Sequence, residues 1–171
     1  MSEVKLTTIR VEGAGPVYDG VMAVCQKHGL TVVNDTSASL FVLANVQRIV
    51  PAAEFMAPPL GTLCFHPSVL PRHRGRDAVY WTIKMGDTTT GVSWFWVSEK
   101  VDAGDVAIAR EIATPPDISP RDLYNLHLAQ LGVDAFDELI GQILVGTIPR
   151  TVQDESLATF ELGRPPKPVV S

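Results

Sequence analysis

One apolar run, Leu40-Phe41-Val42-Leu43-Ala44, constrains the fold of this chain most strongly. Five residues are far too few to cross a bilayer, which needs about 20 apolar residues in a helix. A short and wholly apolar run of this kind is typical of a parallel strand that is buried on both faces of its sheet. Helices must then cover the sheet, so the run predicts an α/β protein.

The segments around this run alternate between strand and helix patterns. Strand patterns cover residues 4–11, 30–33, 60–65, 91–97 and 105–112. Helix patterns cover residues 16–29, 52–56, 78–84 and 119–145, with Gly132 as the expected interruption of the last one. The Ser-Pro start at residue 119 and Gly146 mark the ends of that long helix. We therefore expect a Rossmann-like, open and mostly parallel sheet.

The composition fits one globular domain of this class. The chain has 171 residues, of which 46% are hydrophobic and 19% are charged, so it can bury a core. We expect an α/β domain over residues 1–150 and a C-terminal extension over residues 151–171. Residues 163–168, with three prolines, are expected to be extended and mobile.

Charge and cysteine content exclude several classes of function. A net charge of −5 gives no general attraction for nucleic acid or an anionic membrane. No secretory signal is visible at the N-terminus, and the two cysteines do not form a disulfide framework, so we expect a cytoplasmic protein. The Gly13-Ala14-Gly15 sequence does not complete a dinucleotide-binding pattern, because Tyr18 stands at the third glycine position.

Two segments carry the residues suited to chemistry. His66 ends a predicted strand and Pro67 then turns the chain away, which places the imidazole where open α/β sheets bind ligands. A structural, hydrogen-bonded histidine is the alternative. Asp102 and Asp105 flank Gly104 in a loop after another strand. Either the loop is only a turn before the next strand, or one of the two acids pairs with His66. A carboxylate beside an imidazole orients the ring for acid–base catalysis, whereas the ligands for a metal ion are too few.

These segments together resemble the folate-dependent formyltransferase family. The resemblance rests on His66-Pro67-Ser68-Val69-Leu70-Pro71, on Gly75, on Gly91-Val92 and on Asp102-Ala103-Gly104-Asp105, in the family's order and spacing. It covers roughly residues 38–162 and is most specific for the hydrolase domain of 10-formyltetrahydrofolate dehydrogenase. It implies the formyltransferase type of α/β sheet, here shortened at the N-terminus by about one strand–helix unit.

The resemblance also implies a substrate and a mechanism. Members of the family use 10-formyltetrahydrofolate, whose formyl carbon an amine or water attacks. His66 would stabilise the resulting oxyanion, and Asp102 would keep His66 protonated and accept a proton. Cys64 stands where transferases of the family carry an asparagine that donates to the oxyanion. A thiol is a weak donor, so Cys64 favours hydrolysis or a less efficient transferase, and a small buried side chain is the alternative role.

A folate pocket is carried over from the same resemblance. It would consist of Arg48, Ile49 and Val50, of an apolar wall at Leu70, and of the loop residues Ser98, Glu99, Lys100 and Val101. Ordinary core positions are the alternative for the apolar members. A basic loop formed by Arg72, His73, Arg74 and Arg76 suits an anionic substrate or the folate glutamate tail, or else a solvated surface.

Three functions remain open at this stage. The first is transfer of the formyl group to a small amine acceptor, the second is hydrolysis to tetrahydrofolate and formate, and the third is a non-catalytic module that binds folate or a partner. The shortened N-terminus puts the acceptor site in question, and strand edges exposed there would favour a homodimer.

Overall fold

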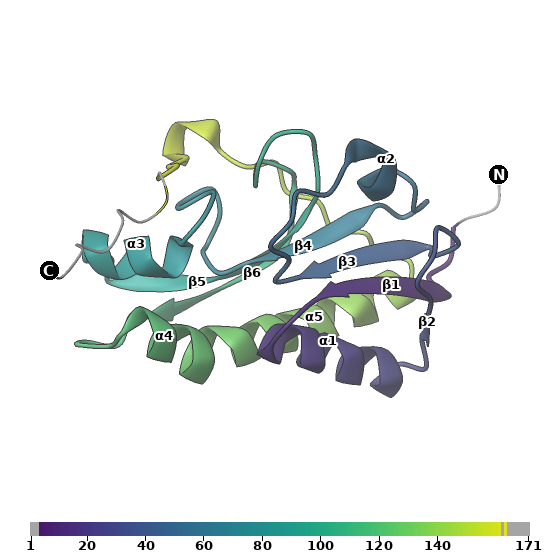
Figure 1. Cartoon of the computed structure of the whole chain (residues 1–171), viewed down its shortest axis with the longest axis horizontal. Helices are drawn as coiled ribbons and strands as arrows, with labels where there is room; N and C mark the ends of the chain where they lie inside the picture. Colours follow the sequence, from purple (N-terminus) through teal and green to yellow (C-terminus); the bar gives the residue numbers. More distant parts are fainter. Residues whose placement is uncertain (1–3, 162, 164–171) are drawn as a thin grey trace, which may run out of the picture.

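Six strands form one sheet in the order β2-β1-β3-β4-β5-β6 in the computed structural model, which describes residues 4–161 and 163 (Figure 1). The strands are β1 (Thr8–Gly13), β2 (Thr31–Val32), β3 (Leu40–Ala44), β4 (Thr62–His66), β5 (Thr89–Trp96) and β6 (Val106–Ala113). The first four run parallel to one another, whereas β5 and β6 are antiparallel to their neighbours. The expected open and mostly parallel α/β sheet is therefore confirmed.

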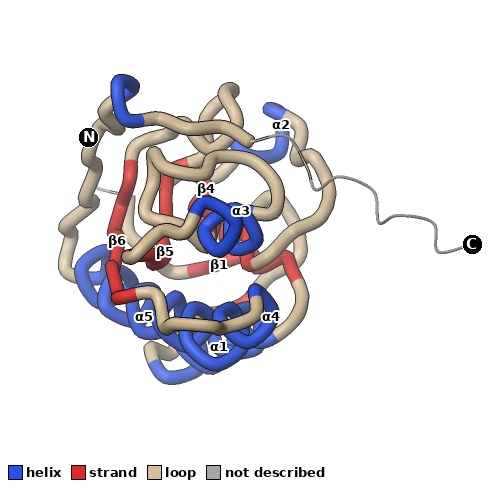
Figure 2. The backbone as a smooth tube through the Cα atoms, turned by 90° about the vertical axis from the view of Figure 1, so that its left-hand side faces the viewer, coloured by secondary structure: helices blue, strands red, loops and turns tan. Residues whose placement is uncertain are grey.

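The long helices lie together on one face of this sheet. They are α1 (Pro16–Lys27), α4 (Pro120–Leu123), η1 (Tyr124–Leu128) and α5 (Ala129–Leu144). Figures 1 and 2 show α1, α4 and α5 side by side below the strands. The shorter helices are α2 (Ala52–Phe55), α3 (Ala78–Met85) and η2 (Glu155–Leu157). Both α2 and η2 lie on the opposite face, among the loops that carry the polar residues (Figure 1).

The strand β3 has the role that its sequence predicts, because all five of its residues are buried and it pairs in parallel with β1 and β4. The first strand begins later than the expected residues 4–11. It runs from Thr8 to Gly13, since its register places Ile9 opposite Leu40 and Gly13 opposite Ala44. A side chain at Gly13 would collide with the Ala44 carbonyl, so only glycine allows this approach.

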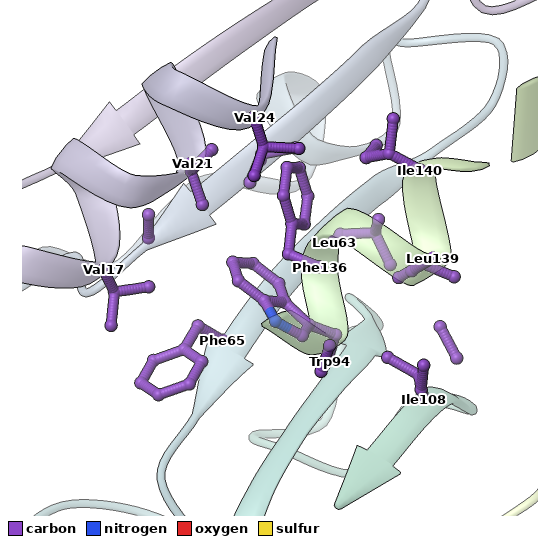
Figure 3. Packing of buried hydrophobic residues seen from close by; sticks show 14 of the residues in the cluster. Val17, Val21, Val24, Leu63, Phe65, Trp94, Ile108, Phe136, Leu139 and Ile140 are labelled. Carbon is purple, nitrogen blue, oxygen red and sulfur yellow. The ribbon is translucent and has the colours of Figure 1, made fainter. Parts of the chain in front are cut away.

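The hydrophobic core lies between the sheet and the layer of α1 and α5. Trp94 of β5 is fully buried, and its ring contacts Phe65 of β4 and Phe136 of α5, with centroid distances of 5.4 and 4.8 Å. Figure 3 shows Val17, Val21 and Val24 of α1 next to this aromatic group. Because side chains alternate along a strand, burying Phe65 on the helix side turns the neighbouring Cys64 and His66 to the opposite face.

The long C-terminal helix differs from its prediction in one detail. Ser119 caps it as expected, since its Oγ accepts a hydrogen bond from the Asp122 N–H. The interruption is not at Gly132 but over Tyr124–Leu128, which form a π-helical turn. Gly132 lies inside α5, where a Cβ atom would come within 2.4 Å of the Phe65 ring, so the glycine permits close packing rather than a break.

Two segments bear on the chain's organisation. Residues 33–39 join β2 to β3 without a helix. Residues 151–161 return along the sheet, where Thr151 forms a bridge with Val106 and Phe160 forms one with Arg74. Apart from Gly163, the stretch expected to be extended and mobile lies outside the described residues.

Candidate active site

The loop after β4 carries the first catalytic candidate. His66 is the last residue of β4 and is only 6% exposed. The backbone that follows is fixed by Ser93 of β5, whose hydroxyl donates to the Ser68 carbonyl and accepts from the Leu70 N–H. The neighbouring strand therefore holds the turn that begins at Pro67, which keeps the imidazole at the carboxyl end of β4.

The loop after β5 brings Asp102 to the same place. This residue has φ 51°, a left-handed conformation that aspartate tolerates better than most residues. Two residues later Gly104 packs against the Trp96 carbonyl, at a distance that leaves no room for a side chain. The Asp102 carboxylate accepts a 2.7 Å hydrogen bond from the Gly75 N–H, so it is tied to the loop that follows His66.

The two candidates meet as the sequence predicts. Nδ1 of His66 lies 3.5 Å from Oδ2 of Asp102, and both side chains are largely buried. On the other side of the ring, Nε2 donates a 2.7 Å hydrogen bond to the His73 carbonyl, which fixes the proton on that nitrogen. Both ring nitrogens thus face oxygen acceptors, an arrangement that a protonated imidazole satisfies fully. The pair is suited to exchanging protons with a reacting group near Nδ1.

Cys64 lies two residues before His66 on β4, on the same face of the sheet. Burial raises the pKa of its thiol, and the negative charge of Asp102 raises it further. A neutral thiol is a poor nucleophile, because the thiolate is the reactive form. Cys64 therefore has a place beside the pair but not the chemistry of a covalent catalyst.

The predicted pocket residues after β3 form an exposed and charged rim. Arg48 pairs with Glu12 at the end of β1 and with Glu54 of α2. The next residue, Ile49, is 94% exposed, and Val50 is partly buried. Arg48 is thus held by two carboxylates, while Ile49 is available to a ligand.

The second half of the predicted pocket is the loop before Asp102. Ser98, Glu99, Lys100 and Val101 are all exposed. The Val97 N–H donates to the Thr62 carbonyl, and the Thr62 hydroxyl donates to the Phe55 carbonyl of α2. The loop and α2 therefore approach the same end of β4, on the face that also carries Cys64 (Figure 1).

The predicted wall residue Leu70 follows His66 by four positions. It is 6% exposed and lines a cavity of about 520 Å³ that extends along the edge strand β6. Gln153 and Arg110 also line this cavity, but neither His66 nor Asp102 does. Within residues 4–161 and 163, no group of three or more His, Cys, Asp or Glu side chains is arranged to hold a metal ion.

The basic loop has carboxylate partners within the chain. Arg72 pairs with Asp87, and Arg74 is buried and pairs with Glu155. His73 is only 2% exposed and lies between two carboxylates. Three of the four basic residues thus have carboxylate partners within the chain, His73 and Arg74 are buried, and Arg72 and Arg76 are exposed.

The sequence reasoning missed residues of the C-terminal segment. The Gln153 amide donates to the carbonyls of Asp102 and Gly104, at 2.8 and 2.7 Å. Glu161 accepts a 2.7 Å hydrogen bond from His73. The one available signal was indirect. Buried backbone N–H and C=O groups in the two loops need hydrogen-bond partners, which another part of the chain must supply.

Residues 23–137 match the Formyl transferase family. The chain belongs to this family. Its relatives include the mitochondrial 10-formyltetrahydrofolate dehydrogenase of Mus musculus, 38% identical over 124 residues, which are 72% of this chain and 13% of that protein. They also include the methionyl-tRNA formyltransferase of Syntrophus aciditrophicus (strain SB), 33% identical over 131 residues, which are 77% of this chain and 42% of that protein.

The fold agrees with that of a solved structure. The crystal structure of HypX from Aquifex aeolicus in complex with tetrahydrofolic acid superposes with a TM-score of 0.79 at 19% identity. The match covers 91% of this chain and 29% of that one. The chain thus spans about an eighth of the dehydrogenase relatives' length, and its family membership rests on this shared domain. None of the helices within the described ranges combines the length and apolar character that crossing a bilayer requires.

Proposed function

We propose that the chain is an enzyme that transfers the formyl group of 10-formyltetrahydrofolate to a small amine, with His66 and Asp102 as its acid–base pair. The observation that carries the proposal is the geometry of this pair, with Nδ1 of His66 3.5 Å from the Asp102 carboxylate and Nε2 held by the His73 carbonyl. Family membership supports the formyl group as the cargo, and the names of the relatives support a folate donor.

The residues present suit such a reaction. The lone pair of the amine forms a bond to the formyl carbon, and the carbonyl electrons move to its oxygen. His66 stabilises this oxyanion and then donates a proton to the departing folate nitrogen as the carbon–nitrogen bond breaks. Asp102 accepts the proton that the attacking amine must lose. Acid–base catalysis of this kind contributes about 10²- to 10⁴-fold in rate.

The exposed apolar Ile49 and the 98–101 loop support a folate site next to this pair. Ile49 is 94% exposed and all four residues of the loop are exposed, so both segments are accessible to a ligand. The ring of a bound folate would lie against them, with its formyl group toward His66. The ion pairs of Arg48 would hold the rim in place during binding.

Hydrolysis of 10-formyltetrahydrofolate to tetrahydrofolate and formate is the second candidate. Two observations favour it: the thiol of Cys64 is a weak donor at the oxyanion position, and the mouse relative at 38% identity is a 10-formyltetrahydrofolate dehydrogenase. In this reaction water takes the place of the amine, and Asp102 receives its proton.

One experiment separates these candidates. The purified protein is incubated with 10-formyltetrahydrofolate alone and with a panel of small amines, while tetrahydrofolate formation is followed. Turnover that requires an amine supports transfer, whereas steady turnover without one supports hydrolysis. Wild-type rates no higher than those without protein would refute the enzyme and leave a module that binds without turnover, and a wild-type rate that H66A matches would refute the role of His66.

A further inference from the structure

The C-terminal segment, residues 151–161, contacts both loops that supply the catalytic pair. It comes after the long helix and returns across the face of the sheet opposite α1 and α5, with η2 drawn in yellow in Figure 1. Backbone hydrogen bonds tie it at both ends: Thr151 exchanges two with Val106, and the Thr159 carbonyl accepts one from the Arg74 N–H. The segment is therefore an integral part of the fold around the site.

Gln153 is the contact with the Asp102 loop. Its side chain is buried, and its amide nitrogen donates to the carbonyls of Asp102 and Gly104. Its amide oxygen accepts two hydrogen bonds from Arg74, at 3.1 and 2.8 Å. Because only an amide offers donors and an acceptor in this geometry, Gln153 joins the loop of Asp102 to the loop that follows His66.

Glu161 is the contact with the His66 side. Oε1 of Glu161 lies 2.7 Å from Nδ1 of His73, while Asp87 lies 2.8 Å from Nε2 of the same ring. His73 has φ 57°, a strained conformation for a residue other than glycine. Its side-chain contacts hold that conformation, which in turn directs the His73 carbonyl at Nε2 of His66.

We propose that Gln153 and Glu161 are positioning residues for the catalytic pair, Gln153 through the backbone of Asp102 and Glu161 through His73. This inference rests on the proposed function for its kinetic part and on the hydrogen bonds alone for its structural part. Neither residue contacts His66 or the Asp102 carboxylate directly. Losing either contact lets one partner move relative to the other, and misplacement by about 1 Å costs as much as 100-fold in rate.

The kinetic test compares two variants with two matched controls. Q153M removes the donors and the acceptor at similar volume, and E161A removes the carboxylate. We expect kcat to fall about 10- to 100-fold, with KM within about threefold of the wild type, because neither residue meets the substrate. Q26M, on the exposed surface of α1, and E138A, which loses a surface ion pair with Arg110, are expected to leave both constants unchanged.

A second measurement does not depend on turnover. Nitrogen-15 spectra of the histidine rings report which nitrogen of His66 carries the proton and what it contacts. We expect the His66 signals to move in Q153M and in E161A, but not in the controls. His66 signals unchanged from the wild type in both variants would overturn the inference, as would unchanged kcat in an active enzyme.

The two failures remain distinguishable. If the wild type has no activity toward 10-formyltetrahydrofolate, the proposed function fails and the spectra alone decide the inference. Circular dichroism establishes folding first, and Q153E replaces Q153M if the latter does not fold, because a carboxylate keeps the hydrogen bonds from Arg74. Q153E still loses both donors, so the same movement of the His66 signals is expected.

Discussion

Replacing Asp102 by asparagine tests the central pair with the least disturbance of the fold. Asparagine adopts the left-handed conformation of Asp102, φ 51°, as readily as aspartate does. Its side-chain oxygen can still accept the hydrogen bond from the Gly75 N–H. D102N therefore removes the negative charge near His66 and little else, so we expect the free energy of unfolding to change by less than about 1 kcal/mol.

The separation of the pair sets the scale of the effect. At 3.5 Å, two unit charges attract by about 5 kcal/mol at an effective dielectric constant of ~20 and by about 1 kcal/mol in bulk water. The site lies between these limits, since both side chains are largely but not fully buried. Loss of an acid–base partner typically lowers the rate about 10²- to 10⁴-fold, or about 3–5 kcal/mol in the barrier.

The assay is steady-state formation of tetrahydrofolate from 10-formyltetrahydrofolate, with the amine that gives the highest wild-type rate or with water alone. D117N is the matched control, because Asp117 is exposed and has almost the same backbone conformation, φ 54°. We expect kcat to fall at least 100-fold in D102N and not at all in D117N. A D102N enzyme with more than about a third of the wild-type kcat would refute the assigned role.

Three other perturbations have defined outcomes. In H66A, we expect kcat to fall about 10³-fold or more, and urea unfolding to show a loss of about 1–3 kcal/mol because the His73 carbonyl loses its donor. In C64A, turnover is expected to stay within about tenfold of the wild type, and a loss as large as that of H66A would contradict this expectation. A thiol reagent at pH 8 should label wild-type Cys64 slowly, since burial raises the pKa of its thiol. The hydrogen bond from Arg72, together with one from His73, lowers the pKa of Asp87 below its ordinary 3.8. The wild type should therefore be more stable than D87N above pH 3.8, and this difference should disappear as the pH falls through the lower folded-state pKa of Asp87. Urea unfolding of both proteins between pH 6 and pH 2 measures it, and a constant difference would count against the pairing.

The parts of the fold that local pattern controls were predictable from the sequence. The apolar composition of β3 and the capping Ser119 act over a few residues, and the structure has both where the sequence predicts them. The approach of His66 and Asp102 was also predicted, but from resemblance rather than from periodicity. No local pattern indicates that two loops thirty-six positions apart will meet.

The errors come from interactions over long sequence separations. A cluster of basic residues usually forms a solvated surface, yet His73 is buried by carboxylates from Asp87 and Glu161, the latter 88 positions away. The π-helical turn at Tyr124–Leu128 was also not predicted, because these five residues contain no glycine or proline, and the nearest ones, Pro120 and Gly132, lie outside the turn. Such features depend on the packed tertiary structure, which residue pattern alone does not reveal.

The hydrogen bonds of Gln153 and Glu161 also bear on how the protein matures. During synthesis His66 and Asp102 leave the ribosome well before these partners, which follow 51 residues after Asp102 and 88 residues after His73. Closing such distant contacts is among the slower steps of folding. A nascent chain that ends at Leu144 therefore already contains His66 and Asp102 but lacks Gln153 and Glu161, and under the two proposals above it would become active only after residues 151–161 are made and packed.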